Sequence, residues 1–148
     1  MTDELDLGPR LSGRLIYLLK RALVRLHALH DEHLEASGVT APELAVLLLL
    51  DGREPESQQQ AAQRLGVDRT TMVGLLDALE AKHLVARRPD PGDRRRNVIA
   101  LTRAGHQKLQ QATRASDRAE RELLAELDDS EATQLRELLG RIAPRPHG

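Results

Sequence analysis

Apolar residues recur at three- and four-residue steps through much of the chain, which is the pattern of amphipathic helices. The first such stretch predicts a long helix over about residues 9–37, ending near Gly38. A short, strongly apolar run follows Thr40 and Glu43, whose spacing is that of a capping box, and this run stops at Gly52. These residues predict a second, well-buried helix.

Two short helices joined by a three-residue turn are predicted next. Ser57 and Gln60 repeat the capping-box spacing, and Gly66 stands where a left-handed residue would end the helix. Asp68 can then accept a hydrogen bond from the free amides of a following helix, which begins at Arg69. Helices separated by so short a turn are typical of a helix-turn-helix.

Alternating and β-branched residues follow, and they predict two strands over residues 84–90 and 97–102. The connecting sequence, residues 90–93, reads DPGD. Pro91 fixes the second turn position, and Gly92 can supply the positive φ that a type II turn requires at the third. We therefore expect a β-hairpin directly after the helix-turn-helix.

The pattern is helical again in the last third of the chain. A loose apolar seam runs through residues 102–127, and Asp128 with Glu131 can cap a final helix. The predicted fold is mostly α with a small β-hairpin, in a single domain over residues 1–148. Because so small a chain leaves the apolar stripes of its terminal helices poorly covered, we expect them to pack against a second copy. The expected parts are a winged helix-turn-helix core at about 40–102 and dimerisation helices at about 9–37 and 103–143.

The absence of cysteine limits the chemistry of the chain, which has 148 residues, one Tyr and no Phe or Trp. Without thiols it holds no disulfide, no thiolate zinc site and no thiol-based redox switch. No stretch approaches the roughly twenty apolar residues needed to cross a bilayer. We therefore expect a cytoplasmic protein without membrane contacts.

Charge is nearly balanced overall, with 22 basic and 23 acidic residues, but it is unevenly distributed. Six arginines and two acidic residues lie between Arg87 and Arg103, whereas eight acidic residues and three arginines lie between Asp117 and Glu137. Like charges so close together repel one another, so folding alone does not explain the arginine cluster. Positive potential gathered on one part of a molecule attracts a polyanion. Beside a helix-turn-helix, that polyanion is expected to be double-stranded DNA.

The second helix of the helix-turn-helix has one apolar face and one free face. The free face carries short side chains near its N-terminal end, which suits insertion into a major groove. Arg94 lies nearest the hairpin tip, where a guanidinium can enter a minor groove, and either Arg95 or Arg96 can pair with Asp93. The predicted DNA contacts are Asp68, Arg69, Thr70, Thr71, Val73 and Gly74 on the recognition helix, Ser57, Gln58 and Gln59 on the preceding helix, and Arg87, Arg88, Asp93, Arg94, Arg95 and Arg96 on the wing.

Residues 57–105 resemble the core of the MarR (multiple antibiotic resistance regulator) family of winged helix-turn-helix regulators. The resemblance includes the Asp-x-Arg feature at Asp93 and Arg95 and an L-T-x-x-G ending at Gly105, and the flanking helices fit as well. It implies a homodimer that binds a pseudo-palindromic operator in double-stranded DNA, usually as a repressor. It also implies a cavity between the dimerisation helices and the winged core, where a small aromatic or amphipathic effector relieves repression.

Two positions depart from the family pattern. His83 stands where the family often has Gly, and His adopts a left-handed backbone more readily than most residues. Gly74 stands where a longer polar or basic side chain is common on the groove-facing surface. The bases that other members read therefore do not carry over to this chain.

Three histidines on the first predicted helix, His27, His30 and His33, lie among acidic residues. They can be a polar helix end, a metal site or a pH-sensitive effector site. Successive three-residue steps rotate around a helix, so the three imidazoles do not converge on one ion, and we predict neither a metal nor a cofactor. Tyr17 is either packed core or, together with His27 and His30, part of the effector pocket.

No catalytic grouping is visible in the sequence. The serines lie in capping or helical contexts, no phosphate-binding glycine loop is present, and paired carboxylates occur only on charged helix faces. We therefore predict a sequence-specific DNA-binding regulator that is not an enzyme. The alternative is a winged domain that acts as a protein-interaction adaptor without specific DNA binding. Affinity for duplex DNA that falls steeply with salt distinguishes the two.

Overall fold

Helices occupy most of residues 8–144, the part of the chain that the computed structural model describes. The predicted fold class, mostly α with a winged helix-turn-helix core, is confirmed. In chain order the elements are α1 (Gly8–Ser12), α2 (Leu15–Leu34), the 3-10 helix η1 (Glu35–Ser37), α3 (Ala41–Leu50), β1 (Glu56–Ser57), α4 (Gln58–Leu65), α5 (Arg69–Ala81), β2 (Val85–Asp90), β3 (Asp93–Leu101), α6 (Arg103–Leu123) and α7 (Asp129–Ile142).

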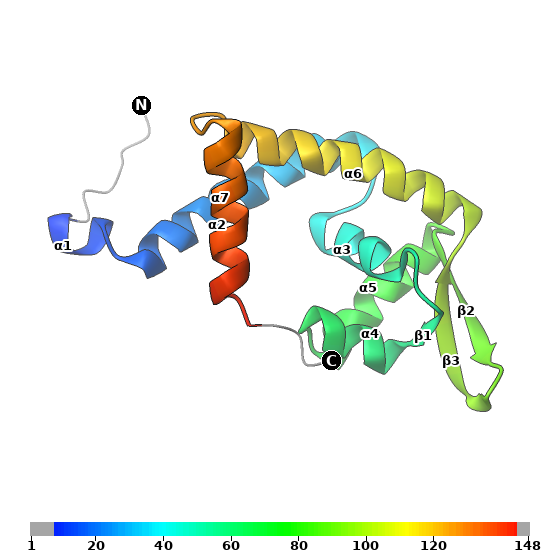
Figure 1. Ribbon diagram of the computed structural model, residues 1–148. Coiled ribbons are helices and arrows are strands. Elements are labelled where there is room, and N and C mark those ends of the chain that lie inside the picture. Colours follow the sequence, from blue (N-terminus) through cyan, green and yellow to red (C-terminus); the bar gives the residue numbers. More distant parts are fainter. Residues whose placement is uncertain (1–7, 145–148) are drawn as a thin grey trace.

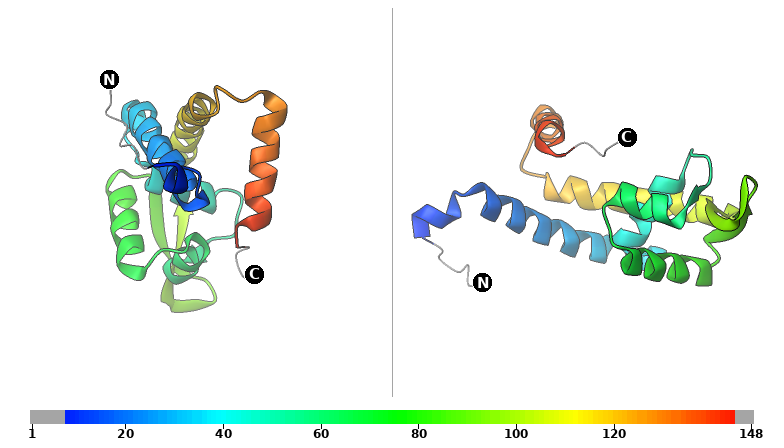
Figure 2. Two further views of the ribbon diagram at one scale, coloured as in Figure 1. Left: turned by 90° about the vertical axis from the view of Figure 1, so that its left-hand side faces the viewer. Right: turned by 90° about the horizontal axis from the view of Figure 1, so that it is seen from below.

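The two longest helices form one side of the molecule and the winged core forms the other. Figure 1 shows α2 and α6 packed along each other, with α3, α4, α5 and the hairpin on the opposite side. The two views in Figure 2 show that α7 turns away from the end of α6 and that the N-terminal part of α2 extends beyond the core. The N-terminal part of α2 therefore lies away from the helix-turn-helix and the hairpin.

The hydrophobic core lies mainly in the winged half and is aliphatic. Leu47 of α3, Met72 and Leu79 of α5 and Ile99 of β3 are all fully buried, and Leu34 at the end of α2 joins the same cluster. Burying a side chain of this size stabilises the fold by about 1.5–3 kcal/mol. Because the cluster contacts α5 from several elements, the core fixes how α5 sits against the sheet.

The predicted helix boundaries depend on local hydrogen bonds, and most of them are confirmed. Reciprocal capping boxes begin α3, α4 and α7 as predicted. Gly66 ends α4 in the left-handed region, with φ of 67°, and the Asp68 side chain caps α5. His83 has φ of 60°, so it does adopt the left-handed conformation for which the family often uses Gly.

The helix predictions were wrong at two places. The first helix is not continuous, because a turn at Gly13 separates α1 from α2 and Arg14 is extended at the N-cap of α2. Glycine costs a helix about 1 kcal/mol relative to alanine, which favours a break at this point. The long helix after the hairpin ends at Leu123 instead of Leu127.

The hairpin prediction needs two corrections. The sheet has three antiparallel strands in the order β1-β3-β2, because the two-residue strand β1 pairs with β3, which begins at Asp93 and not at residue 97. Gly92 does not have a positive φ, so the turn is not type II. Instead, the Asp90 carboxylate accepts a hydrogen bond from the Gly92 amide at 2.9 Å. This Asx contact closes the turn without a left-handed residue.

The junction between the sheet and α6 explains the glycine at position 105. The Thr102 hydroxyl donates to the carbonyl oxygen of His83 at 2.6 Å and accepts from the amide of Gly105 at 2.9 Å. A Cβ on Gly105 would collide with the carbonyl oxygen of Leu84. Helix α6 therefore starts in direct contact with the backbone that leads into β2.

Two helices expose apolar faces. The α2 face consists of Leu15, Ile16, Leu18, Leu19, Leu23 and Val24, and the α7 face consists of Leu135, Leu138, Leu139 and Ile142. Ile16 is 75% exposed, Ile142 is 70% exposed, and α7 has no buried residue. Within residues 8–144 no single helix is long and apolar enough to cross a membrane, although Leu15–Ser37 and Ala41–Leu50, bent by 73°, meet that test as a pair.

Candidate nucleic-acid interface

The exposed first turn of α5 is shaped by its cap. The Asp68 carboxylate accepts a hydrogen bond from the amide of Thr71 at 2.6 Å, and this bond lowers the pKa of Asp68. Arg69, Thr70 and Thr71 are exposed on this turn, whereas Met72 is buried in the core. The apolar residues thus turn α5 so that the predicted groove-facing side chains meet solvent.

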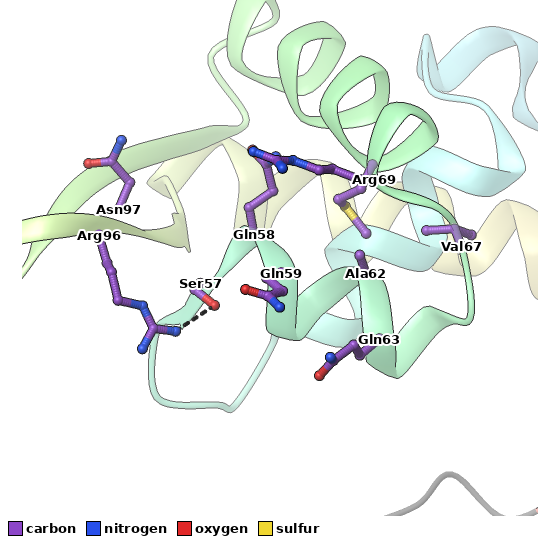
Figure 3. Close-up of a pocket in the computed structure, with 10 residues that line it drawn as sticks. Ser57, Gln58, Gln59, Ala62, Gln63, Val67, Arg69, Arg96 and Asn97 are labelled. Carbon is purple, nitrogen blue, oxygen red and sulfur yellow. Dashed lines mark hydrogen bonds between the residues drawn. The ribbon is translucent and has the colours of Figure 1, made fainter.

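A hollow of about 570 Å³ lies between the N-terminal ends of α4 and α5 and strand β3. Figure 3 shows Gln58, Gln59 and Gln63 of α4 on one side of it, Arg69 reaching across from α5, and Asn97 on the strand. Ala62, Val67 and Met72 form its apolar part. The two consecutive helices of the helix-turn-helix and a strand further along the chain therefore present amides and guanidinium groups around one concave surface.

Ser57 contributes to this site through its cap and not as an exposed side chain. Its side chain is buried. The hydroxyl oxygen accepts a hydrogen bond from the amide of Gln60 at 3.2 Å and another from a guanidinium nitrogen of Arg96 at 3.1 Å (Figure 3). Arg96 thus ties the wing strand to the start of α4. The remaining exposed polar groups at this end of α4 include Gln59.

The wing arginines divide into exposed and paired side chains. Arg88, Arg94 and Arg95 are exposed, and Arg96 is also exposed although it bonds Ser57. Arg87 is half-buried, and its guanidinium bonds Asp77 at 2.8 Å and Glu80 at 3.2 Å, both on α5. Arg87 therefore faces α5.

Asp93 has a different partner from those expected. Its carboxylate accepts a hydrogen bond from the backbone amide of Arg95 at 3.0 Å, while the guanidinium of Arg96 bonds Ser57. Neither expected pairing with a guanidinium is seen for Asp93 among these contacts. The carboxylate instead fixes the backbone where β3 leaves the turn.

The predicted effector residues do not gather at one place. His27 lines a hollow of about 500 Å³ between α2 and α3, with Asp31, Ala41 and Pro42. His30 instead joins α2 to α6, because its Nδ1 bonds the carbonyl oxygen of Leu26 at 3.0 Å and its Nε2 bonds the hydroxyl of Ser116 at 2.8 Å. Tyr17 is half-buried and is not among the residues around this hollow.

His33 also connects two helices, through a 2.9 Å contact between its Nε2 and the carboxylate of Glu122 on α6. No group of three or more His, Asp or Glu side chains within residues 8–144 is arranged to hold a metal ion. The imidazoles of His30 and His33 thus serve helix packing in this structure.

Sequence reasoning missed two polar residues of the hollow, Gln63 and Asn97, as well as its apolar part. Gln63 lies one helical turn after Gln59, so the helical period alone could have placed both on one face. Asn97 had no comparable signal, since its position depends on the register of β3 against β2, in which it pairs with Pro89.

A short helix-turn-helix, a three-stranded sheet and an arginine-rich wing beside the recognition helix define a winged helix-turn-helix protein. The chain matches the MarR family over residues 37–96. It is 30% identical over 142 residues to the HTH-type transcriptional regulator PecS of Dickeya dadantii, covering 94% of this chain and 84% of PecS. The chain belongs to the MarR family.

Two further proteins are similar to it. The HTH-type transcriptional repressor NicR of Pseudomonas putida is 33% identical over 89 residues, which span 60% of this chain but only 56% of NicR. The structure of the transcriptional repressor CouR bound to a 23-mer DNA duplex has a TM-score of 0.86 and 34% identity, covering 92% of this chain and 96% of CouR. CouR from Rhodococcus jostii RHA1 bound to p-coumaroyl-CoA has a TM-score of 0.78 and 30% identity, covering 91% of this chain and 95% of CouR.

Proposed function

We propose that this protein is a cytoplasmic transcriptional repressor that binds double-stranded DNA as a homodimer and has no catalytic activity. The observation that carries the proposal is the concave surface formed by α4, α5 and β3, with the exposed arginines of the wing beside it. Amides and hydroxyls suit base edges and phosphates, and guanidinium groups suit phosphates and narrow minor grooves. The CouR complex with duplex DNA supports the same use of this fold.

Within this proposal, Thr70, Thr71 and Val73 enter a major groove and Arg94 enters the neighbouring minor groove. Gln58 and Gln59 contact the phosphate backbone beside the recognition helix. Arg88 and Arg95, which are exposed, contact phosphates along the wing. Because Gly74 and the threonines are short, base readout is modest and much of the affinity comes from phosphates.

The homodimer is supported by the apolar faces of α2 and α7. Neither face has a covering element within the described residues, and water contact with so many leucines is unfavourable. A second copy offers each of these faces an apolar surface of the same kind. Two-fold symmetry would separate the recognition helices by roughly 34 Å, one turn of duplex.

The hollow between α2 and α3 is the proposed effector site. It lies between the dimerisation half and the winged half, where a bound molecule contacts both. His27 and Asp31 supply polar groups at its wall, while Ala41 and Pro42 supply apolar surface. Small aromatic or amphipathic molecules, including aromatic thioesters of the kind bound by CouR, fit this chemistry. Binding there would favour a spacing of the two winged cores that does not match the DNA.

Selection from a pool of random duplexes tests the proposal directly. We expect enrichment of a pseudo-palindromic sequence, and an affinity for it that falls with salt with a log-log slope of about −5 to −7, from six to eight neutralised phosphates per dimer. Sedimentation at micromolar concentration should give the mass of a dimer. A monomer that enriches no sequence would favour a protein-interaction adaptor instead.

The effector site is tested by adding aromatic acids and their thioesters to the complex with the selected duplex. Release of the duplex from the normal protein, but not from His27→Ala, would support the effector site.

A further inference from the structure

Arg87 differs from the other arginines of the wing in what it contacts. Its guanidinium lies 2.8 Å from the carboxylate of Asp77 and 3.2 Å from that of Glu80, and its side chain is only 26% exposed. Asp77 and Glu80 lie on the recognition helix α5, whereas Arg87 lies on strand β2 of the wing. One side chain therefore bridges the two elements that the proposed function sends into adjacent grooves.

The neighbouring Arg88 provides an internal comparison. It is exposed and follows Arg87 on β2, and side chains of successive strand residues point to opposite faces. Arg88 is therefore free to meet a phosphate. Arg87 could do so only by leaving both carboxylates, which would then stand uncompensated beside a polyanion, and like charges at that range repel.

We propose that Arg87 is a positioning residue, which sets the angle between the wing and the recognition helix by clamping Asp77 and Glu80, and that it is not a phosphate ligand. This rests on the proposed function, in that both elements must contact the same duplex. The planar guanidinium matches the task, because it can hold two carboxylates at once in a fixed geometry, whereas an ammonium group cannot.

The clamp predicts a change in DNA affinity that is opposite in sign to the change expected from simple electrostatics. Removing two negative charges beside DNA should tighten binding, yet Asp77→Asn with Glu80→Gln releases Arg87 and so should weaken it. We expect that pair of changes, and Arg87→Ala, each to weaken binding about tenfold per dimer. The protein that carries all three changes should bind DNA as tightly as either variant, to within about twofold, because each variant already lacks the same clamp.

The measurement is fluorescence anisotropy with a labelled 30-base-pair duplex of mixed sequence at low salt. Arg88→Ala is the matched control, and its effect should be equal in the normal and the Asp77→Asn, Glu80→Gln backgrounds. Arg87→Lys keeps the charge but not the fork, so the clamp predicts a loss close to that of Arg87→Ala. Equal effects of Arg87→Ala in both backgrounds, or near-normal binding by Arg87→Lys, would show a direct phosphate contact and overturn the proposal.

Hydrogen exchange of the free protein gives a readout that needs no DNA. Backbone amides of β2 and β3 should exchange faster in Arg87→Ala and in Asp77→Asn, Glu80→Gln, and at the normal rate in Arg88→Ala. Unchanged exchange in all variants would also overturn the clamp. If the normal protein binds no duplex, the proposed function fails, and the exchange rates alone then decide whether Arg87 fixes the wing.

Discussion

Replacing Lys82 with Met tests the ion pair that this residue forms at the end of the recognition helix. The Lys82 ammonium donates to both carboxylate oxygens of Glu43, at 2.9 and 3.0 Å, and to the carbonyl oxygen of Gly38 at 2.8 Å. The Glu43 side chain is 4% exposed and that of Lys82 is 40% exposed. The substitution therefore leaves a buried carboxylate whose partner has gone.

The size of the effect follows from this burial. Breaking a fully buried pair costs about 3–5 kcal/mol, and water near the half-exposed Lys82 lowers this to about 2–3 kcal/mol. For a protein of this size the loss corresponds to a fall in Tm of about 5–10 °C at a fixed protein concentration. Glu43→Gln should cost less, about 1 kcal/mol, because an amide oxygen can still accept from Lys82 and from the Thr40 amide.

The pH dependence supplies a second check. Burial opposes ionisation of Glu43, but the hydrogen bonds from Lys82 and Thr40 outweigh it, so the pKa of Glu43 lies below its ordinary value of 4.5. A group with a lowered folded pKa contributes stability above its unfolded pKa and loses it as the pH falls through the folded pKa. In Lys82→Met the hydrogen bonds from Lys82 are gone, so burial of Glu43 has less to oppose it and the pKa of Glu43 rises relative to that in the normal protein. The stability gap between the two proteins should therefore narrow as the pH drops from 6 to 4.

Chemical denaturation of the four proteins of the double-mutant cycle measures these quantities. Lys82→Met should cost less in the Glu43→Gln background, because only hydrogen bonds to neutral oxygens are then lost and no charge remains unpaired. A cost that is the same in both backgrounds, or a gap that widens on acidification, would refute the reasoning from the buried pair.

Three further outcomes are expected. Arg94→Ala should weaken binding to every duplex about tenfold, whereas Thr70→Ala should change the preferred sequence more than the affinity for random DNA, as read by anisotropy with selected and random duplexes; equal effects on both would reject the division between wing and helix. A chain that stops before Glu131 should sediment as a monomer at micromolar concentration, because α7 loses the apolar face proposed to contact a second copy, and a persistent dimer would contradict this. Gly105→Ala should lower the free energy of unfolding, measured in urea, by about 1–3 kcal/mol, because the new Cβ meets the carbonyl oxygen of Leu84. An unchanged midpoint of urea denaturation would show that the backbone shifts to make room for the Cβ.

The features that the sequence predicted correctly depend on contacts between residues close in the chain. A capping box needs only a hydroxyl or carboxylate and an acceptor three residues later, so the starts of α3, α4 and α7 could be read directly. The left-handed Gly66 follows from the same local logic. Helix periodicity likewise separated the buried Met72 from the exposed Thr70 on α5.

The features it missed depend on contacts made after folding or on competing local bonds. Strand β1 has only two residues and exists because Glu56 and Ser57 pair with β3, from which α4, α5 and β2 separate them in the chain. At the hairpin turn, Gly92 could have taken a positive φ, but the Asp90 side chain closed the turn by another hydrogen bond. Sequence propensity placed the turn correctly, but it gave the wrong turn type, because two different hydrogen-bonding arrangements suit the same residues.

The arginine run shows the same limit within the candidate site. Charge density marked residues 87–96 as a polyanion-binding segment, but it could not separate Arg87 from Arg88, because only the packing of β2 against α5 brings Asp77 into reach. Alternation along β2 makes that separation. On β2 it turns one arginine towards the recognition helix and the next towards solvent, and on β3 Arg96 reaches the start of α4. The run therefore has two parts. Arg87 and Arg96 bond residues of the helix-turn-helix, whereas Arg88, Arg94 and Arg95 are the exposed arginines proposed to contact a duplex.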